Sequence, residues 1–401
     1  MDRSLALAAS MLAVCSILGY GVRGVVRANC TDVALLKELV SGSLQRTTSD
    51  LGPKFDTRVA AVYSYQRAEY LESASRLQAL CAKSKCQRTD RYWLALDLAR
   101  LGRFEEAGRE IAAGQVEVAI AEEAGQAEDL GEIEWAGRLA RSLAVTGRLP
   151  SNVEGHVWRL YEEGLEARAS QFVTLFEVHY EERSPERAFL AGLRCRVERR
   201  LPDAARNFET ALQRSLEGTG LWKRAWYRLW NTYRDMGAYH RAIDLLSQEF
   251  SRLSSEQASS EAAEAALAIA RVYRASGERE PAKKWAEVAR SLHPDWWPAY
   301  LELGLADCSV ELLDRGLALN PDSPELLRAK ALCLWKKDRQ SEAIELGELI
   351  VARYPTVPAS RAVYAALERW YLDRGNTAAA ERIRRKRGEV GKKPAIPRAR
   401  K

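Results

Sequence analysis

Histidine and methionine are scarce in this chain, and the residue patterns of common enzymes are missing. The 401 residues include 4 His and 3 Met. No two histidines lie three or four positions apart, so no helix offers a His pair to a metal ion. The GxxxxGK phosphate loop, the HExxH metal motif and the GxSxG nucleophile motif are absent as well. We therefore expect no catalytic residue, no cofactor and no metal site, and infer a binding function.

A general excess of basic residues is also lacking, because the positive charge is concentrated at the C-terminal end. The chain carries 61 Lys and Arg against 55 Asp and Glu, a net charge of +6. Residues 381–401 hold ten Lys or Arg and two Glu, so the other 380 residues have a net charge of −2. No nucleic-acid partner is expected from this distribution. From Glu110 to Trp135 the bias reverses, with eight acids and no Lys or Arg, which we interpret as a solvated face.

Long apolar runs are missing too, with one exception near the N-terminus. Residues 4–22 carry no charge, and nineteen helical residues span about 28 Å, close to the ~30 Å hydrocarbon core of a bilayer. We expect residues 1–28 to be a signal-anchor or transmembrane segment and 29–54 to be a linker. Two alternatives stay open: a signal peptide cleaved after Ala28, and a lipoprotein signal at Cys15. The basic residues near this segment favour a cytoplasmic position for the large domain.

Cysteines are few and mostly dispersed. Of the 7 cysteines, Cys195, Cys308 and Cys333 lie on apolar helical faces, which indicates small core residues. Cys81 and Cys86 form a close pair whose spacing falls within the range of zinc ligands, but no second pair completes a site. We interpret them as two free thiols, with a disulfide as the alternative if the domain lies outside the cytoplasm.

Strand signals are absent after residue 55, and the remaining sequence has helical periodicity. Two turns share a pattern of glycine, an aromatic residue two positions later and an alanine five positions later: Gly102, Phe104, Ala107 and Gly237, Tyr239, Ala242. Gly277 and Ala282 keep the interval of five, and Pro321 and Pro355 lie 34 residues apart. Glycine ends a helix readily and proline stops one, so these marks indicate repeated helix–turn–helix units.

The pattern resembles the tetratricopeptide repeat, a unit of two helices in 34 residues. The resemblance is better over 181–385, assigned to such repeats, than over 55–180, assigned to degenerate helical repeats or an inserted bundle. It implies an all-α fold, an α-solenoid in which hairpins stack into a right-handed superhelix. The interval of 27 residues between Pro294 and Pro321 predicts a hairpin shortened by about one turn in each helix. Beyond residue 385 we expect a disordered basic tail, 386–401.

In the family that this chain resembles, the first helix of each unit lines a concave groove. The register of the repeats selects eleven residues, of which six are arginine. The candidate partner-binding residues among them are Tyr227, Asn231, Arg234, Arg271, Arg274 and Arg328, and the others are Phe189, Arg196, Arg224, Asp235 and Trp335. Arginines in this number suit an acidic peptide, because guanidinium groups pair with carboxylates in bidentate fashion. The alternative is that arginine merely keeps the chain soluble. A stripe of Trp222, Trp226 and Trp230 is interpreted as core between repeats.

These observations favour a membrane-anchored scaffold or adaptor, and not an enzyme. It would bind other proteins through its groove during assembly of a membrane or cell-envelope complex. Two alternatives remain: a secreted or periplasmic repeat protein after signal cleavage, and a helical accessory subunit of an envelope enzyme. If the domain is cytoplasmic, contact of the basic tail with anionic lipid is a further expectation, because Lys and Arg are attracted to such surfaces. The alternatives are a solubilising end without a partner and contact of the tail with the acidic run 110–134.

Overall fold

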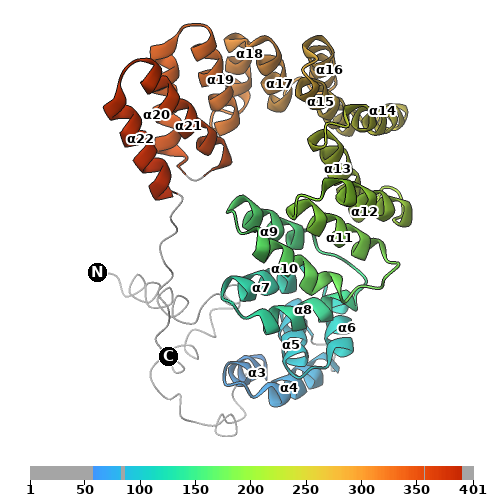
Figure 1. The fold of residues 1–401 in the computed structure, drawn as a ribbon. Helices are drawn as coiled ribbons and strands as arrows, with labels where there is room; N and C mark the ends of the chain where they lie inside the picture. Colours follow the sequence, from blue (N-terminus) through green and yellow to red (C-terminus); the bar gives the residue numbers. More distant parts are fainter. Residues whose placement is uncertain (1–56, 83–85, 356, 391–401) are drawn as a thin grey trace. The chain divides into compact units, whose positions relative to one another are not determined.

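The computed structural model describes residues 57–82, 86–355 and 357–390 (Figure 1). These ranges form helices joined by turns and contain no strand. Within them, no helix combines the length and apolar character needed to cross a membrane. The expected anchor over 1–28 and linker over 29–54 lie outside the described residues, as does 391–401, so these assignments stay predictions.

Two compact units make up the chain, and they divide after Glu198. The helices of the first unit are α3 (Thr57–Gln66), α4 (Tyr70–Ala82), α5 (Arg88–Arg100), α6 (Phe104–Gly114), α7 (Glu117–Asp129), α8 (Ile133–Ala144), α9 (Ser151–Glu162), α10 (Glu166–Glu177) and α11 (Pro185–Val197). The helices of the second are α12 (Leu201–Arg214), α13 (Gly220–Asp235), α14 (Tyr239–Ser255), α15 (Ser259–Ser276), α16 (Arg279–Leu292), α17 (Trp297–Asp307), α18 (Val310–Leu319), α19 (Pro324–Lys336), α20 (Gln340–Arg353), α21 (Pro358–Asp373) and α22 (Thr377–Val390).

Consecutive helices within each unit pack side by side as hairpins (Figure 1). In the first unit, α5 packs on α6, α7 on α8 and α9 on α10. In the second unit, the first helices of successive hairpins, α15, α17, α19 and α21, also pack on one another in that order. Each hairpin thus buries its apolar face against the next. The all-α prediction of stacked hairpins is confirmed, whereas the handedness of the array stays a prediction.

The turns between helices close in the way that the glycine pattern predicts. Gly102 and Gly237 have φ angles of 76° and 74°, in the left-handed region where a Cβ is strained. The residue after each glycine donates its N–H to a carbonyl five positions earlier: Arg103 to Leu98 and Ala238 to Tyr233, both at 2.8 Å. This hydrogen bond is the signature of a Schellman motif, which satisfies the last carbonyls of a helix.

Small residues sit where two helices approach closely. Ala242 is 0% exposed and Ala282 is 2% exposed, as the sequence predicts. In the hairpin of α17 and α18, a Cβ on Gly304 would lie 2.5 Å from Cγ of Leu313. These two helices have 11 and 10 residues, against 18 and 14 in α15 and α16, so the predicted shortening is confirmed.

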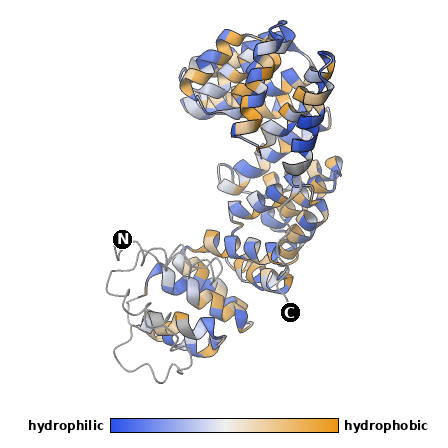
Figure 2. Cartoon of the chain, turned by 90° about the vertical axis from the view of Figure 1, so that its left-hand side faces the viewer, coloured by the Kyte–Doolittle hydropathy of each residue, from blue (hydrophilic) through white to orange (hydrophobic). Residues whose placement is uncertain are grey.

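Hydrophobic and hydrophilic residues alternate along the helices (Figure 2). This is the amphipathic pattern of helices that are buried on one side and solvated on the other. In the last hairpins of the second unit, Leu367 and Ile350 are 0% exposed and Trp370 is 4% exposed within one cluster. The last two hairpins therefore share one apolar cluster that reaches from α19 to α22.

The C-terminal helix is longer than the sequence predicts. Helix α22 continues to Val390, whereas the sequence assigned 386–401 to a disordered tail. Lys386 and Arg387 favour a helical conformation. The preceding turns of α22 already bury Ala380 and Ile383 in the core, so the helix only has to be extended. The helix therefore extends into the basic segment.

Candidate interaction surface

Two arginines of α15 share one buried carboxylate of α17. Nε of Arg271 donates to Oε1 of Glu302 at 3.0 Å, and Nε of Arg274 donates to Oε2 at 2.7 Å. The Glu302 side chain is 5% exposed, while those of Arg271 and Arg274 are 34% and 42% exposed. A buried carboxylate therefore fixes two guanidinium groups that reach the surface. The three charges sum to +1, which favours a negatively charged partner.

The other predicted residues lie on α13 and α19. Tyr227 is 46% exposed, which is unusual for a large aromatic side chain. Arg234 pairs with its neighbour Asp235 at 2.8 Å and lies over the ring of Trp230, 5.7 Å from its centre. Arg328 is half-buried on α19. Contacts of these residues with a partner stay a prediction.

Asn231 and Phe189 are the residues that the register misplaces. Asn231 is 6% exposed, and its amide donates to the carbonyl of Tyr227 at 2.8 Å, one turn earlier in the same helix. Phe189 is 0% exposed. Both side chains are thus buried in the free chain, although the register of the repeat places them on the groove face. They leave little surface for a partner.

The tryptophan stripe on α13 is divided between core and surface. Trp230 is 2% exposed and belongs to the core, as predicted. Trp222 and Trp226 are half-buried. On α19, Trp335 stacks on Trp370 of α21 with ring centres 4.9 Å apart, so this aromatic contact ties two successive first helices together.

The acidic run from Glu110 to Trp135 is not simply a solvated face, because arginines from other helices neutralise much of it. Arg91 of α5 pairs with Glu110 at 2.5 Å. Arg159 of α9 pairs with Asp129 at 2.7 Å. Asp129 is exposed, as the interpretation as a solvated face predicts, whereas Glu128 is buried and contradicts it. The ion pairs also link neighbouring helices.

Glu128 lies at the centre of this network, buried at 3% exposure. Arg168 of α10 donates to both of its carboxylate oxygens at 2.8 and 2.9 Å, and His156 of α9 lies 3.0 Å away. Burial alone would raise the pKa of Glu128, but the hydrogen bonds from His156 and Arg168 bring it below its usual value. The network joins α7, α9 and α10 through one carboxylate.

The same residues bring metal-ligand atoms together without forming a site that suits a metal ion. Glu128, Asp129 and His156 each place one such atom within 4.8 Å of the others. Arg168 and Arg159 already occupy the carboxylates, and Arg159 also approaches Nδ1 of His156 at 2.9 Å. Two guanidinium groups would repel a cation here, so we interpret the cluster as a structural ion-pair network.

An aromatic cluster on α3 and α5 escapes sequence analysis. The ring centres of Tyr65 and Trp93 are 5.1 Å apart, and those of Tyr92 and Trp93 are 5.4 Å apart. Burial raises the pKa of Tyr65 to about 12. The hydroxyl of Tyr92 donates to Glu123 of α7 at 3.4 Å, and burial raises the pKa of that carboxyl. Nothing in the spacing of these residues separates them from ordinary core aromatics.

A buried acid in the first unit also has no sequence signal. Asp97 of α5 is 0% exposed and accepts a hydrogen bond of 2.5 Å from the hydroxyl of Ser73. Its second oxygen, Oδ1, is buried without a hydrogen-bond partner. Burial raises the pKa of Asp97 to about 7. The sequence alone does not show whether Asp97 lies on the buried or the exposed face of its helix.

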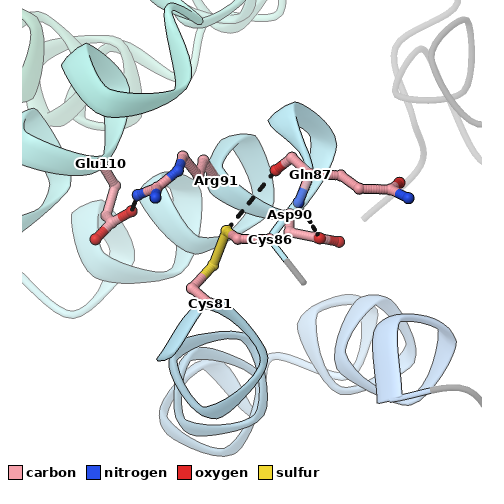
Figure 3. The surroundings of a disulfide bond; sticks show 6 residues. All are labelled: Cys81, Cys86, Gln87, Asp90, Arg91 and Glu110. Carbon is pink, nitrogen blue, oxygen red and sulfur yellow. Dashed lines mark hydrogen bonds and ion pairs between the residues drawn. A yellow bond between two sulfur atoms is a disulfide. The ribbon is translucent and has the colours of Figure 1, made fainter. Parts of the chain in front are cut away.

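Cys81 and Cys86 form a disulfide between the end of α4 and the start of α5 (Figure 3). The interpretation as two free thiols is therefore wrong, whereas the side of the membrane on which the domain lies stays a prediction. Gln87 follows directly and caps α5, since its N–H donates to the Asp90 carboxylate at 2.6 Å. The disulfide thus clamps one hairpin to the next where the chain enters α5. Cys195 and Cys333 are buried, as predicted. Cys308 is half-buried and ends α17 in the left-handed conformation, so its assignment to a helical core face is wrong.

Comparison with known proteins identifies no family for this chain. No protein-family model matches the sequence, and no curated protein is significantly similar to it. Similar solved structures include MamA, with 20% identity, a TM-score of 0.32 and coverage of 40% of this chain and 94% of MamA. TTC0263, a thermophilic TPR protein of Thermus thermophilus, has 23% identity, a TM-score of 0.36 and coverage of 46% and 98%. YrrB, described as a TPR protein with an unusual peptide-binding site, has 18% identity, a TM-score of 0.30 and coverage of 47% and 93%.

At these TM-scores the similarities have no bearing on the partner of this chain. The resemblance to tetratricopeptide repeats rests on features of the chain itself: stacked hairpins, Schellman turns at Gly102 and Gly237, and buried alanines where helices meet.

Proposed function

We propose that this chain is a scaffold of tetratricopeptide type that holds protein partners against the first helices of its second unit. The observation that carries this proposal is the pair of Arg271 and Arg274. Both arginines are held by the buried Glu302 carboxylate, and both are partly exposed to solvent. An ordered, half-exposed charge pair of this kind costs less entropy to engage than mobile surface side chains do. Exposed Tyr227 on α13 is a separate candidate contact, because aromatic side chains recur in protein interfaces.

Site-specific photo-crosslinking in the cell tests this function. A photoreactive phenylalanine analogue replaces Tyr227 on α13 or, as a matched control, Leu349 on α20, which is 50% exposed. We expect discrete crosslinked proteins from position 227 and none of the same species from position 349. Identical products from both positions, or no product from position 227, would contradict a partner on the first helices.

We further propose that residues 4–22 hold the scaffold in a membrane, where it assists assembly of a membrane or cell-envelope complex. The support is the uncharged run of nineteen residues. Leu12→Arg is expected to release the protein from membranes, because a central arginine costs about 2.5–3.5 kcal/mol on insertion scales. A mature N-terminus at Asn29 would instead show cleavage.

The disulfide supports placing the helical units on the oxidising side of that membrane, opposite to the side that the basic residues favour. Structural disulfides persist in oxidising compartments and are rare in the cytosol. Trypsin cleaves after Arg76, Lys83, Lys85 and Arg88, so acid-trapped protein should yield peptides 77–83 and 86–88 joined by a disulfide. Recovery of both peptides as separately alkylated thiols would place the units on the reducing side.

A further inference from the structure

Arg271 and Arg274 bind Glu302 in a way that leaves both Nη groups of each guanidinium unused. Among the described residues, their hydrogen bonds run through Nε alone. Arg339 shows the contrasting arrangement, since its Nε and Nη2 both donate to Glu342, at 2.7 and 2.6 Å. The Nη groups of the α15 pair therefore remain available as donors.

The burial of Glu302 determines where these donors lie. Its carboxylate is 5% exposed, whereas the arginines are 34% and 42% exposed, so the hydrogen-bonded Nε atoms are at the buried end. A planar guanidinium whose Nε is fixed presents its two Nη groups at the opposite edge. Two such edges, from residues three positions apart on one helix, lie next to each other at the surface.

The edges suit anionic oxygen atoms in pairs. Each Nη edge can bind one carboxylate with two parallel N–H···O hydrogen bonds. One negative charge from Glu302 cannot balance two guanidinium groups, so the trio keeps a charge of +1. Because Glu302 already orders both side chains, a partner does not have to supply that ordering entropy.

We infer that Arg271 and Arg274 bind two neighbouring carboxylates of an acidic peptide segment, and that Glu302 is the residue that positions them. This inference rests on the proposed scaffold function and names the class of partner for the same surface. A phosphate group has the same anionic oxygens, so a phosphorylated peptide is the competing source of this chemistry.

Selection from a phage library of random twelve-residue peptides tests the inference on the full chain in detergent. The three baits are the wild-type chain, the double variant Arg271→Gln with Arg274→Gln, and a matched variant with Arg339→Gln and Arg353→Gln. The matched pair lies at the two ends of α20, Arg339 just before its first residue and Arg353 as its last. Both arginines form surface ion pairs, and their replacement removes the same amount of charge.

We expect the wild-type and α20-variant baits to enrich peptides with two Asp or Glu close together, and the α15 variant to lose this enrichment. Equal acidic enrichment by the α15 variant, or none by the wild-type chain, would overturn the inference. Enrichment of non-acidic peptides by the wild-type chain would reject the acidic partner while leaving the scaffold function intact. If the double variant fails to fold by circular dichroism, Arg274→Gln alone should reduce enrichment.

A selected peptide then tests the role of Glu302 and the competing phosphate. Glu302→Gln removes one negative charge, so charge alone predicts tighter binding of the acidic peptide. Loss of positioning predicts binding at least tenfold weaker instead. Unchanged or tighter binding would reject the positioning role. A peptide with phosphoserine in place of the acids should bind less tightly, and preferential binding of that peptide would assign the site to phosphate.

Discussion

Individual residues show most clearly what the sequence can and cannot reveal. The charge of Arg271 and Arg274 and their place on a first helix follow from the repeat register. Their anchor does not, because Glu302 lies 31 and 28 residues away. Asn231 fails for a local reason, since its amide turns back to the carbonyl of Tyr227 instead of facing outward. The repeat register predicts which face of the helix a residue lies on. Hydrogen bonds then determine whether a polar side chain on that face points to solvent or back to the helix.

Asp97 leads to a prediction about pH at the residue scale. Folding raises its pKa from 3.8 to about 7, because burial disfavours the charged form. Its contribution to stability is therefore full below about pH 4 and is lost as the pH rises through about 7. Between pH 5 and 8 we expect the free energy of unfolding of the wild-type chain to fall by ~1–3 kcal/mol relative to that of Asp97→Asn. This follows from about 1.4 kcal/mol per pKa unit.

Urea unfolding followed by circular dichroism at pH 5 and pH 8 measures this difference. Asparagine has nearly the shape of aspartate and can still accept the hydrogen bond from Ser73, so packing changes little. Parallel pH dependence of the wild-type and variant chains would show that Asp97 does not stay buried and charged at pH 8.

At the scale of helices and hairpins, the sequence predicts much of the fold. The glycine turns, the buried alanines and the shortened hairpin of α17 and α18 all follow from spacing. The sequence does not mark the turn before α20, because Asp338 takes the left-handed conformation that glycine usually supplies, with a φ of 60°. Its neighbour Arg339 still closes the motif by donating to Leu334 at 3.0 Å. The same turn therefore forms without the glycine that marks the others.

Gly125 gives a prediction at the element scale. A Cβ at this position of α7 would lie 2.8 Å from Nδ1 of His156 and 3.2 Å from its Cε1, in a rigid ring held by Glu128 and Arg159. Gly125→Ala is therefore expected to lower the free energy of unfolding by about 1–3 kcal/mol through overpacking. Thermal unfolding followed by circular dichroism measures the effect.

Gly155 on α9 is the matched control for this substitution. No atom lies within 4 Å of a Cβ added there, so Gly155→Ala should stabilise the helix by ~0.5–1 kcal/mol. If both alanine variants were stabilised equally, α7 and α9 would not approach each other as closely as the structure shows.

At the scale of the whole molecule, composition identifies a helical array with an apolar N-terminal segment and a basic end. It does not reveal the disulfide, since two cysteines five positions apart suit free thiols equally well, and geometry decides between them. Composition also does not reveal the division into two units after Glu198, because the repeat pattern does not change at that point.

The basic end gives a prediction about lipid contact. Arg385 and Lys386 are exposed on α22, and residues 391–401 add five Lys or Arg and no acid. The chain lacking 1–28 is expected to float with anionic vesicles at low salt, at up to about 1 kcal/mol per basic residue near the surface. Removal of 391–401 should reduce flotation, and salt should abolish it. Equal flotation with and without 391–401 would reject a role for this segment.

The most direct test of the central claim compares arginine with lysine at positions 271 and 274. Arg271→Lys with Arg274→Lys keeps the net charge but removes the paired Nη edges, since lysine carries a single ammonium group. The measurement is the affinity of the full chain for a fluorescent acidic peptide from the library, by anisotropy at fixed salt. The account predicts binding at least tenfold weaker with unchanged helicity. Equal affinity would contradict it, because charge alone would then explain capture of the partner.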